Sequence, residues 1–328
     1  MIRVPALMSL ILALCGCAAP YVQAPLLAPA LQTPARMDDA QFVMRDGAAL
    51  PYLRWLPAEE EPWAVIVALH GINDSRAAFR LAGAWWAERG IATYAYDQRG
   101  FGDAPGKGLW PGDLMAEDLG AVVALVRARH PDALVAVAGE SMGGAVAITA
   151  FASENPPDAD RLILLAPAVW GWSSQPLLYR LALSTAAWTF GDVALEPPEW
   201  AADRVLASDN LLELIRNGRD PAQTLSTRLD VVYGLVGLME EAGQGLGAVG
   251  VPTLLLYGAH DDLVPDRAIA QALAQASGHT ALHTAFYPDG HHILNRDLQA
   301  VRVFADVESW LKDPAAPLPS GAGPIGPP

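Results

Sequence analysis

The sequence is poor in cysteine, in basic residues and in long apolar runs. Its two cysteines, Cys15 and Cys17, lie near the start of the 328-residue chain, so the rest has no disulfide, thiolate nucleophile or cysteine metal site. Lys and Arg number 21 against 36 Asp and Glu, and the formal net charge of −15 argues against a nucleic-acid partner. The apolar stretch 4–14 is too short to span a bilayer. What is present, 52% hydrophobic and 17% charged residues, is the composition of a globular protein with an ample core.

The N-terminus has the features of an export signal. A basic residue and the apolar stretch precede the sequence LCGC (14–17), which resembles a bacterial lipobox, the motif whose final cysteine becomes lipidated. We therefore expect residues 1–16 to be a signal peptide and Cys17 to carry a lipid anchor. The protein would then be held on the membrane of the bacterial cell envelope and face the periplasm. The alternative is an ordinary signal peptide cleaved near Ala18, followed by secretion.

Composition divides the remaining chain into a core and two flanking segments. Residues 17–40 repeat Ala and Pro and are predicted to be a tether. Residues 313–328 are rich in Pro and Gly and are predicted to be a disordered tail. Between them, apolar strand-like segments alternate with helical ones, which is typical of a mostly parallel sheet with helices on both faces. We assign residues 41–168 and 251–312 to this α/β core.

The alternation breaks off between the two parts of the core. Residues 169–250 contain no convincing apolar strand, four of the chain's ten tryptophans and several helical patterns. An interval this long inside a compact domain needs structure of its own. The sequence therefore predicts a mostly helical cap inserted over one end of the sheet.

A serine between glycines separates an apolar strand from an apolar helix. The pentapeptide Gly139-Glu140-Ser141-Met142-Gly143 matches G-x-S-x-G, the nucleophile elbow. A serine on so tight a turn has a strained backbone, so the residues two before and two after it must lack side chains. The turn presents the hydroxyl above the carboxyl edge of the sheet. This context predicts that Ser141 is a catalytic nucleophile.

A serine hydroxyl needs a base and a carboxylate to become reactive. Of seven histidines, only His291 and His292 follow a late strand and so reach the same sheet edge as Ser141. Adjacent side chains in an extended loop point in opposite directions, so one of the two is expected to be the base. Asp261 and Asp262 end the preceding strand, and one of them is expected to orient the imidazole. Spacing alone does not choose within either pair.

The reaction also needs two donors for the developing oxyanion. The N–H of Met142 begins the helix after the serine, where a helix N-terminus favours negative charge. The second donor is expected from a loop after an earlier strand, and the sequence HGIND (70–74) offers the N–H of Ile72 there. Gly71 would let that loop approach closely.

Taken together, these motifs resemble the α/β-hydrolase superfamily, and within it the monoacylglycerol lipases and lysophospholipases. The similarity runs through LHGIND (69–74), YAYDQRGFGDAPG (94–106), GESMGG (139–144), VPTLLLYGAHDDLVP (251–265) and YPDGHHIL (287–294). The resemblance implies an α/β-hydrolase fold. It places the acid three residues after the glycine that ends its strand, which selects Asp261. It places the base immediately before the short apolar stretch, which selects His292.

The expected activity is hydrolysis of carboxylic esters with an apolar acyl group, of the monoacylglycerol or lysophospholipid type, through a Ser141–His292–Asp261 triad and an acyl-enzyme. The chemistry requires no metal and no organic cofactor. One alternative is an acyltransferase on the same scaffold, in which an alcohol replaces water in the second half-reaction. The other is a non-catalytic, lipid-binding lipoprotein with an unused triad.

Overall fold

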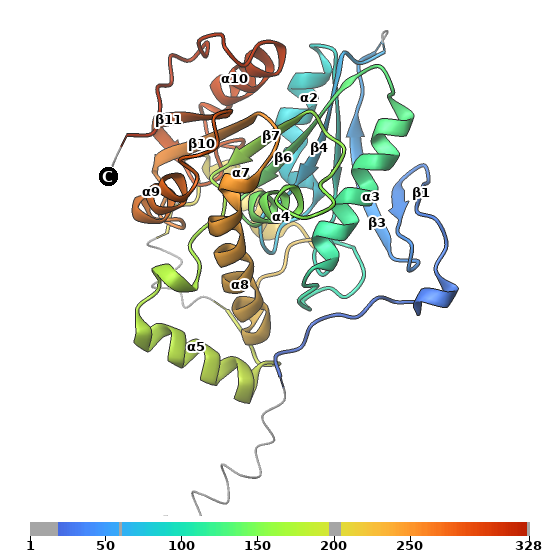
Figure 1. Ribbon diagram of the computed structural model, residues 1–328, viewed down its shortest axis with the longest axis vertical. Helices are drawn as coiled ribbons and strands as arrows, with labels where there is room; N and C mark the ends of the chain where they lie inside the picture. The colour runs from blue at the N-terminus through green and yellow to red at the C-terminus, as the bar shows by residue number, and fades with distance from the viewer. Residues whose placement is uncertain (1–18, 59–60, 197–204, 327–328) are drawn as a thin grey trace, which may run out of the picture.

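The computed structural model describes residues 19–58, 61–196 and 205–326 (Figure 1). The predicted signal peptide and Cys17 lie outside these residues. Within the described ranges, no helix combines the length and the apolar character that a bilayer span requires.

A nine-stranded sheet forms the centre of the described chain, in the order β1-β2-β3-β5-β4-β6-β7-β10-β11. The first three strands and β5 pair in antiparallel fashion, and all pairs from β5 to β11 are parallel. The predicted mostly parallel α/β sheet is therefore confirmed. The strands are β1 (Arg36–Met37), β2 (Gln41–Val43), β3 (Ala49–Trp55), β4 (Ala64–Leu69), β5 (Ile91–Tyr96), β6 (Leu134–Glu140), β7 (Arg161–Leu165), β10 (Thr253–His260) and β11 (Leu282–His291).

Helices cover both faces of the sheet, which explains why its central strands are apolar along their whole length. One face is covered by η2 (Arg76–Phe79), α2 (Arg80–Ala87) and α10 (Ala300–Lys312) (Figure 1). There Trp86 of α2 packs against Phe304 of α10. The other face is covered by α3 (Leu114–Arg129), α4 (Met142–Phe151), α8 (Leu229–Gly245), η4 (Leu246–Ala248) and α9 (Asp266–Gln275). Each face thus has its own buried apolar cluster.

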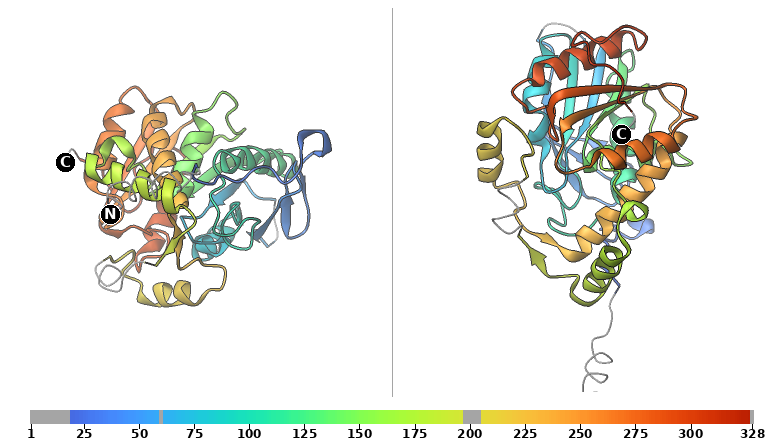
Figure 2. Two further views of the ribbon diagram at one scale, coloured as in Figure 1. Left: turned by 90° about the horizontal axis from the view of Figure 1, so that it is seen from below. Right: turned by 90° about the vertical axis from the view of Figure 1, so that its left-hand side faces the viewer.

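The insertion between the two parts of the core is mostly helical over its described residues, as predicted. It contains η3 (Trp172–Ser174), α5 (Leu177–Phe190), α7 (Leu211–Arg219) and the long helix α8. The structure adds a feature that the sequence did not indicate, a two-stranded ladder of β8 (Ala194–Leu195) and β9 (Thr227–Arg228). These strands are too short to give an apolar pattern. α8 packs on α4 of the core, whereas α5 lies at the far end of the molecule (Figures 1 and 2).

The segment predicted as a tether contacts the core along part of its length. It contains η1 (Pro29–Leu31) and β1, and upstream of them Gln23 is buried. The side-chain amide of Gln23 donates to the carbonyl of Leu109 at 2.7 Å, and its backbone N–H donates to the carbonyl of Trp110 at 2.8 Å. Gly106 makes room for it, because a Cβ there would lie 2.2 Å from the Gln23 side chain. A polar side chain therefore fixes a segment whose composition indicated only flexibility.

The C-terminal tail, predicted to be disordered, instead packs on the core over its described residues. The N–H of Phe286 in β11 donates to the carbonyl of Gly323 at 2.8 Å, and the N–H of Ile325 donates to the hydroxyl of Thr284 at 3.0 Å. Ser320 binds the buried carboxylate of Asp306 on α10. The tail covers the exposed edge of β11, and this requirement of the edge strand is not visible in the tail's own composition.

Candidate active site

The turn between β6 and α4 holds Ser141 in a conformation that few non-glycine residues adopt, with φ 53° and ψ −116°. A Cβ at Gly139 would lie 2.4 Å from the carbonyl oxygen of Gly143. A Cβ at Gly143 would lie 2.4 Å from the carbonyl oxygen of Leu69, at the end of β4. Both flanking glycines are therefore sterically required, as expected for a nucleophile elbow.

The register of the sheet brings the other expected residues to the same edge. In the parallel pair β10–β11, His260 lies opposite His291, so the residues that follow the two strands, Asp261 and His292, are neighbours. Nδ1 of His292 lies 2.8 Å from Oδ2 of Asp261. The side chain of His292 is 5% exposed and that of Asp261 is fully buried.

Asp261 is held firmly in this position. Its second carboxylate oxygen, Oδ1, accepts hydrogen bonds from the N–H groups of Leu263 at 2.8 Å and Val264 at 2.9 Å. With Nδ1 of His292 donating to the carboxylate, Nε2 of that ring is free to act as the proton acceptor. The carboxylate can then orient the ring and stabilise its protonated form.

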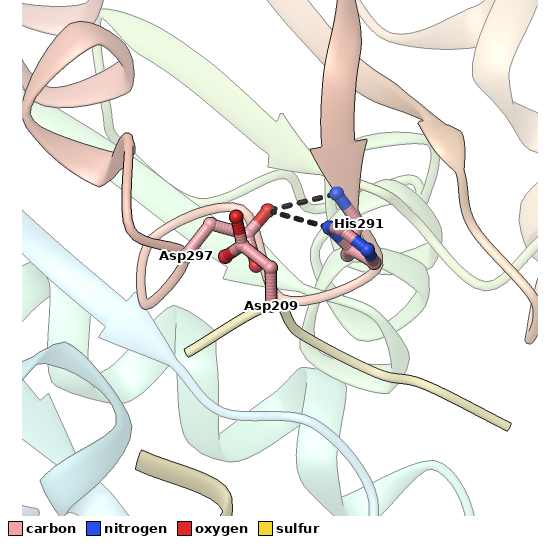
Figure 3. Close-up of side chains that lie close together, drawn as sticks. All are labelled: Asp209, His291 and Asp297. Atoms are coloured by element: carbon pink, nitrogen blue, oxygen red, sulfur yellow. Dashed lines mark hydrogen bonds and ion pairs between the residues drawn. The ribbon is translucent and has the colours of Figure 1, made fainter. Parts of the chain in front are cut away.

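The neighbouring residues in each pair have other contacts. His291 turns toward Asp297: its N–H donates to Oδ2 of Asp297 at 2.8 Å, and its Nδ1 lies 3.7 Å from the same oxygen, with Asp209 beside them (Figure 3). Asp262 accepts a hydrogen bond from the N–H of Leu206 at 3.2 Å. The structure therefore places His292 and Asp261, and not their neighbours, in one hydrogen-bonded pair.

Asp209, His291 and Asp297 bring three potential metal-ligand atoms within 4.8 Å of one another. Both carboxylates already accept hydrogen bonds from the protein: Asp297 from Ser208 at 2.6 Å and from the His291 N–H, and Asp209 from the N–H of Leu298 at 2.8 Å. These contacts are typical of a cross-link between the cap segment before α7 and the loop that carries His292.

The loop after β4 lies against the elbow. A Cβ at Gly71 would lie 3.4 Å from the Cβ of Ser141, so the chain passes beside the serine immediately before Ile72. His70 is completely buried and keeps this loop in place: its Nε2 accepts from the N–H of Gln98 at 3.1 Å, and its carbonyl accepts from the Gln98 side chain at 2.8 Å. Since Nε2 is an acceptor, Nδ1 carries the proton and donates to the carbonyl of Gly71 at 2.7 Å.

A cavity of about 320 Å³ opens above these residues. Ser141, His292 and Ile72 line it, and so do the charged residues Asp74, Glu140 and Arg296. Its remaining wall is largely apolar and comes from the cap and from the loop after Asp261, and includes Trp170, Leu214, Leu235, Met239, Leu263 and Val264. A larger cavity of about 550 Å³ lies between α3, α4 and α8, and neither Ser141 nor His292 lines it.

Comparison with known proteins places the chain in a family. The sequence profile of the family described as serine aminopeptidase, S33 (Hydrolase_4) matches residues 60–299, well over half of the chain. The chain belongs to this family. It is an α/β-hydrolase that resembles the monoacylglycerol lipases.

Several members of the family are similar along most of their length. A monoacylglycerol lipase of Mycolicibacterium smegmatis is 26% identical over 81% of this chain and 93% of its own. A monoglyceride lipase of Mus musculus is 25% identical over 88% of this chain and 94% of its own. The fold also matches the structure of a Saccharomyces cerevisiae monoglyceride lipase with a substrate analogue, at 17% identity and a TM-score of 0.66, over 90% of this chain and 98% of the other.

This family member also has a buried ion triad that our sequence reasoning missed. Nη2 of Arg296 lies 2.5 Å from Oε1 of Glu140, and its Nη1 lies 2.7 Å from Oδ2 of Asp74. Burial raises the pKa of Glu140 despite the nearby guanidinium. Burial also opposes ionisation of Asp74, but Arg296 and the hydrogen bond from Ser75 outweigh it and hold the pKa of Asp74 below its ordinary value. The sequence signal was the acid at the second position of the elbow, which has no partner near it in the chain.

Proposed function

We propose that the protein hydrolyses carboxylic esters with an apolar acyl group, of the monoacylglycerol or lysophospholipid type, and that Ser141, His292 and Asp261 carry the reaction. The observation that supports it most is the pairing of His292 with Asp261 at 2.8 Å, because His292 lines the same cavity as Ser141. The named activities of the relatives point to the same substrate class.

In the proposed mechanism, His292 takes the proton of the Ser141 hydroxyl as the oxygen attacks the ester carbonyl. The imidazolium is stabilised by Asp261. The N–H groups of Ile72 and Met142 bind the oxyanion of the tetrahedral intermediate. His292 then protonates the leaving alcohol, and a water molecule activated by the same ring hydrolyses the acyl-enzyme and regenerates Ser141.

The shape of the cavity supports an apolar acyl group. Apart from Asn217 of α7, the wall formed by the cap and the loop after Asp261 is apolar and consists of Trp170, Ala207, Leu214, Leu235, Met239, Leu263 and Val264. An acyl chain entering this space leaves water for apolar surface, at about 25 cal/mol per Å² buried. The carbonyl carbon would then lie beside Ser141.

The test is a Ser141→Ala variant assayed beside the wild type with monoacylglycerols and p-nitrophenyl esters of graded chain length. If the triad acts as a unit, the variant loses on the order of 10⁶-fold in turnover. A fluorophosphonate probe should label the wild type and not the variant. Because the family description names aminopeptidases, an aminoacyl p-nitroanilide is included. Cleavage of the anilide without cleavage of esters would contradict the proposal, and so would an active Ser141→Ala variant.

We also propose that the protein works at a membrane of the bacterial cell envelope, anchored through Cys17 and facing the periplasm. The described chain begins at residue 19 at the same end of the molecule as α5 (Figures 1 and 2). α5 exposes Leu177, Leu178, Leu181 and Phe190, a surface suited to lipid contact. A Cys17→Ser variant should move from the membrane fraction to the soluble fraction and lose incorporation of labelled palmitate. Membrane retention without label would point to α5 alone.

A further inference from the structure

The buried triad of Asp74, Arg296 and Glu140 joins the three chain segments on which the proposed reaction depends. Glu140 directly precedes Ser141 in the elbow. Asp74 lies two residues after Ile72 in the loop proposed to bind the oxyanion. Arg296 lies four residues after His292, and its guanidinium contacts both carboxylates.

We propose that Arg296 is a positioning residue, which sets the geometry of the nucleophile, the base and the oxyanion donor through its two ion pairs. This inference rests on the proposed function. Arg296 does not have to touch the substrate to act. It acts through the backbone of the segments that it joins.

The burial of all three side chains indicates that the triad serves to fix geometry more than to stabilise the fold. The side chain of Arg296 is 1% exposed, that of Glu140 2% and that of Asp74 10%. Removing charges from water is costly, and replacing a buried ion pair with apolar residues is often neutral or stabilising. A buried triad is therefore a poor means of gaining stability alone. It can, however, fix geometry, because the planar guanidinium donates a directional hydrogen bond to Glu140 and also forms a close ion pair with Asp74.

The surroundings of the triad transmit that geometry to the reacting groups. A Cβ at Gly71 would lie 3.5 Å from Oε1 of Glu140 and 3.4 Å from the Cβ of Ser141, so the loop after β4 and the elbow are in direct contact. Asp74 also accepts from the N–H of Ser75 at 2.7 Å, which fixes the start of η2. The carbonyl of Arg296 accepts from the side chain of Asn210 at 2.9 Å, which ties the cap to the same point.

The chain offers a matched control. Arg99 is also 1% exposed and also joins two buried carboxylates, with Nη1 2.6 Å from Asp46 and Nη2 2.9 Å from Asp118. This second triad joins the turn between β2 and β3 and the loop after β5 to α3, and neither Asp46 nor Asp118 lines the cavity above Ser141. Loss of Arg99 should therefore reproduce the cost of breaking a buried ion triad, and the Arg99 guanidinium bonds to Asp46 and Asp118 and not to the three segments.

The experiment compares Arg296→Lys, Arg296→Met and Arg99→Met for thermal unfolding, for kcat and KM on one ester, and for the rate of fluorophosphonate labelling. All rates are expressed per folded molecule. We expect Arg296→Met to lower kcat and the labelling rate about 10- to 100-fold, the cost of a small misplacement of reacting groups, with little change in KM. Arg296→Lys should recover part of this loss. Arg99→Met should lower the unfolding temperature but keep kcat within about 2-fold of the wild type.

A variant in which all three members of the triad are uncharged distinguishes a positioning role of Arg296 from the effect of leaving buried charges unpaired. In the triple variant Asp74→Asn, Glu140→Gln, Arg296→Met, no charge is left unpaired, so stability should return while kcat stays low. Recovery of kcat together with stability would overturn the inference, and so would wild-type kcat in Arg296→Met. If the wild type itself is not labelled at Ser141, the proposed function fails first, and the inference fails with it. If labelling is normal and only the Arg296 results disagree, the proposed function stands and the positioning role falls.

Discussion

At the scale of single residues, two pairs of adjacent identical residues show how far the local sequence can identify a catalytic base and its carboxylate. Spacing left His291 and His292 equivalent, and Asp261 and Asp262 equivalent. The choice between them came only from a resemblance to a family. In the structure, the distinction arises from pairing between strands: His260 lies opposite His291, which leaves the next residue of each strand to meet. This pairing follows a register shift between Gly258 and His260, where β11 gains two residues relative to β10, and the spacing of residues within either strand does not reveal that shift.

The aspartate pair gives a direct test of the assignment. Asp261→Asn should lower kcat by about 10⁴-fold, because an amide cannot hold His292 in the required tautomer or stabilise its charge. KM should change little. Asp262→Asn is the matched control and should stay within about 2-fold of the wild type, since Asp262 accepts a hydrogen bond from the N–H of Leu206 and not from His292 in the described structure. Steady-state kinetics on one ester decide the matter, and equal losses in both variants would contradict the assignment.

Arg296 lay beyond sequence reasoning for a related reason. The elbow was recognisable because its glycines, strand and helix are contiguous. The ion triad joins three segments that are distant in the chain, and an arginine followed by an aspartate near the end of the core has the appearance of a solvated surface. Only the topology that gathers the carboxyl ends of β4, β6 and β11 at one edge makes it a buried contact.

At the scale of elements, the cap helix α8 was predictable as a helix. Which of its residues would face which cavity was not predictable. Consecutive residues of α8 line different cavities: Met239 lines the one above Ser141, and Leu238 lines the larger one against α3 and α4. The helical pattern indicates an apolar stripe without saying which part of it meets substrate. Placement of the helix across α4 makes that assignment.

A larger side chain at Met239 should shorten the acyl group that the cavity admits. We expect Met239→Trp to lower kcat/KM for long-chain p-nitrophenyl esters about 10-fold or more and to leave short-chain esters nearly unaffected, since only the distal part of the cavity is filled. Leu238→Trp, one residue away on α8, is the control and should leave the chain-length profile unchanged. A uniform loss across all chain lengths would show that Met239 does not line the acyl site.

The C-terminal end of α3 contributes a pH dependence to stability. His130 ends this helix and lies 2.9 Å from the hydroxyl of Tyr94 on β5, and burial, together with the charge of Arg129, lowers the pKa of His130 below its ordinary value of 6.5. The unfolded chain therefore binds a proton that the folded chain resists. Stability from this group is fully present above the ordinary pKa and is lost as the pH falls from that value through the lower pKa of the folded state.

Replacement of His130 should remove that dependence. Denaturant unfolding between about pH 7 and about pH 5 should show a steeper loss of stability in the wild type than in His130→Gln, which keeps a polar side chain without a titrating ring. Tyr94→Phe removes the hydrogen bond but keeps the imidazole, so it should lower stability at every pH and retain the slope. An unchanged slope in His130→Gln would mean that other groups cause the acid sensitivity.

At the scale of the whole molecule, the α/β core followed from alternation of apolar strands and helices, and the interruption of that pattern correctly located the cap. For the two ends of the chain the prediction of flexibility was wrong over the described residues. Composition indicates flexibility but does not show whether the core offers a surface to which the segment can bind. Gln23 fills a space that Gly106 leaves open, and the tail meets hydrogen-bonding groups that β11 leaves unpaired at the edge of the sheet. In both cases, the partner surface decides the conformation.

Truncation after Asp313 should therefore lower the stability of the fold without changing the catalytic rate. It removes the hydrogen bonds that Gly323, Ile325 and Ser320 make to β11 and α10, each contributing about 1 kcal/mol, and exposes a bare edge strand. The expected outcome is a lower unfolding temperature and concentration-dependent light scattering, with kcat per folded molecule unchanged. Truncation after Ile325 keeps all three contacts and should match the full chain. If both truncations unfold at the wild-type temperature, the tail does not cover the edge in solution.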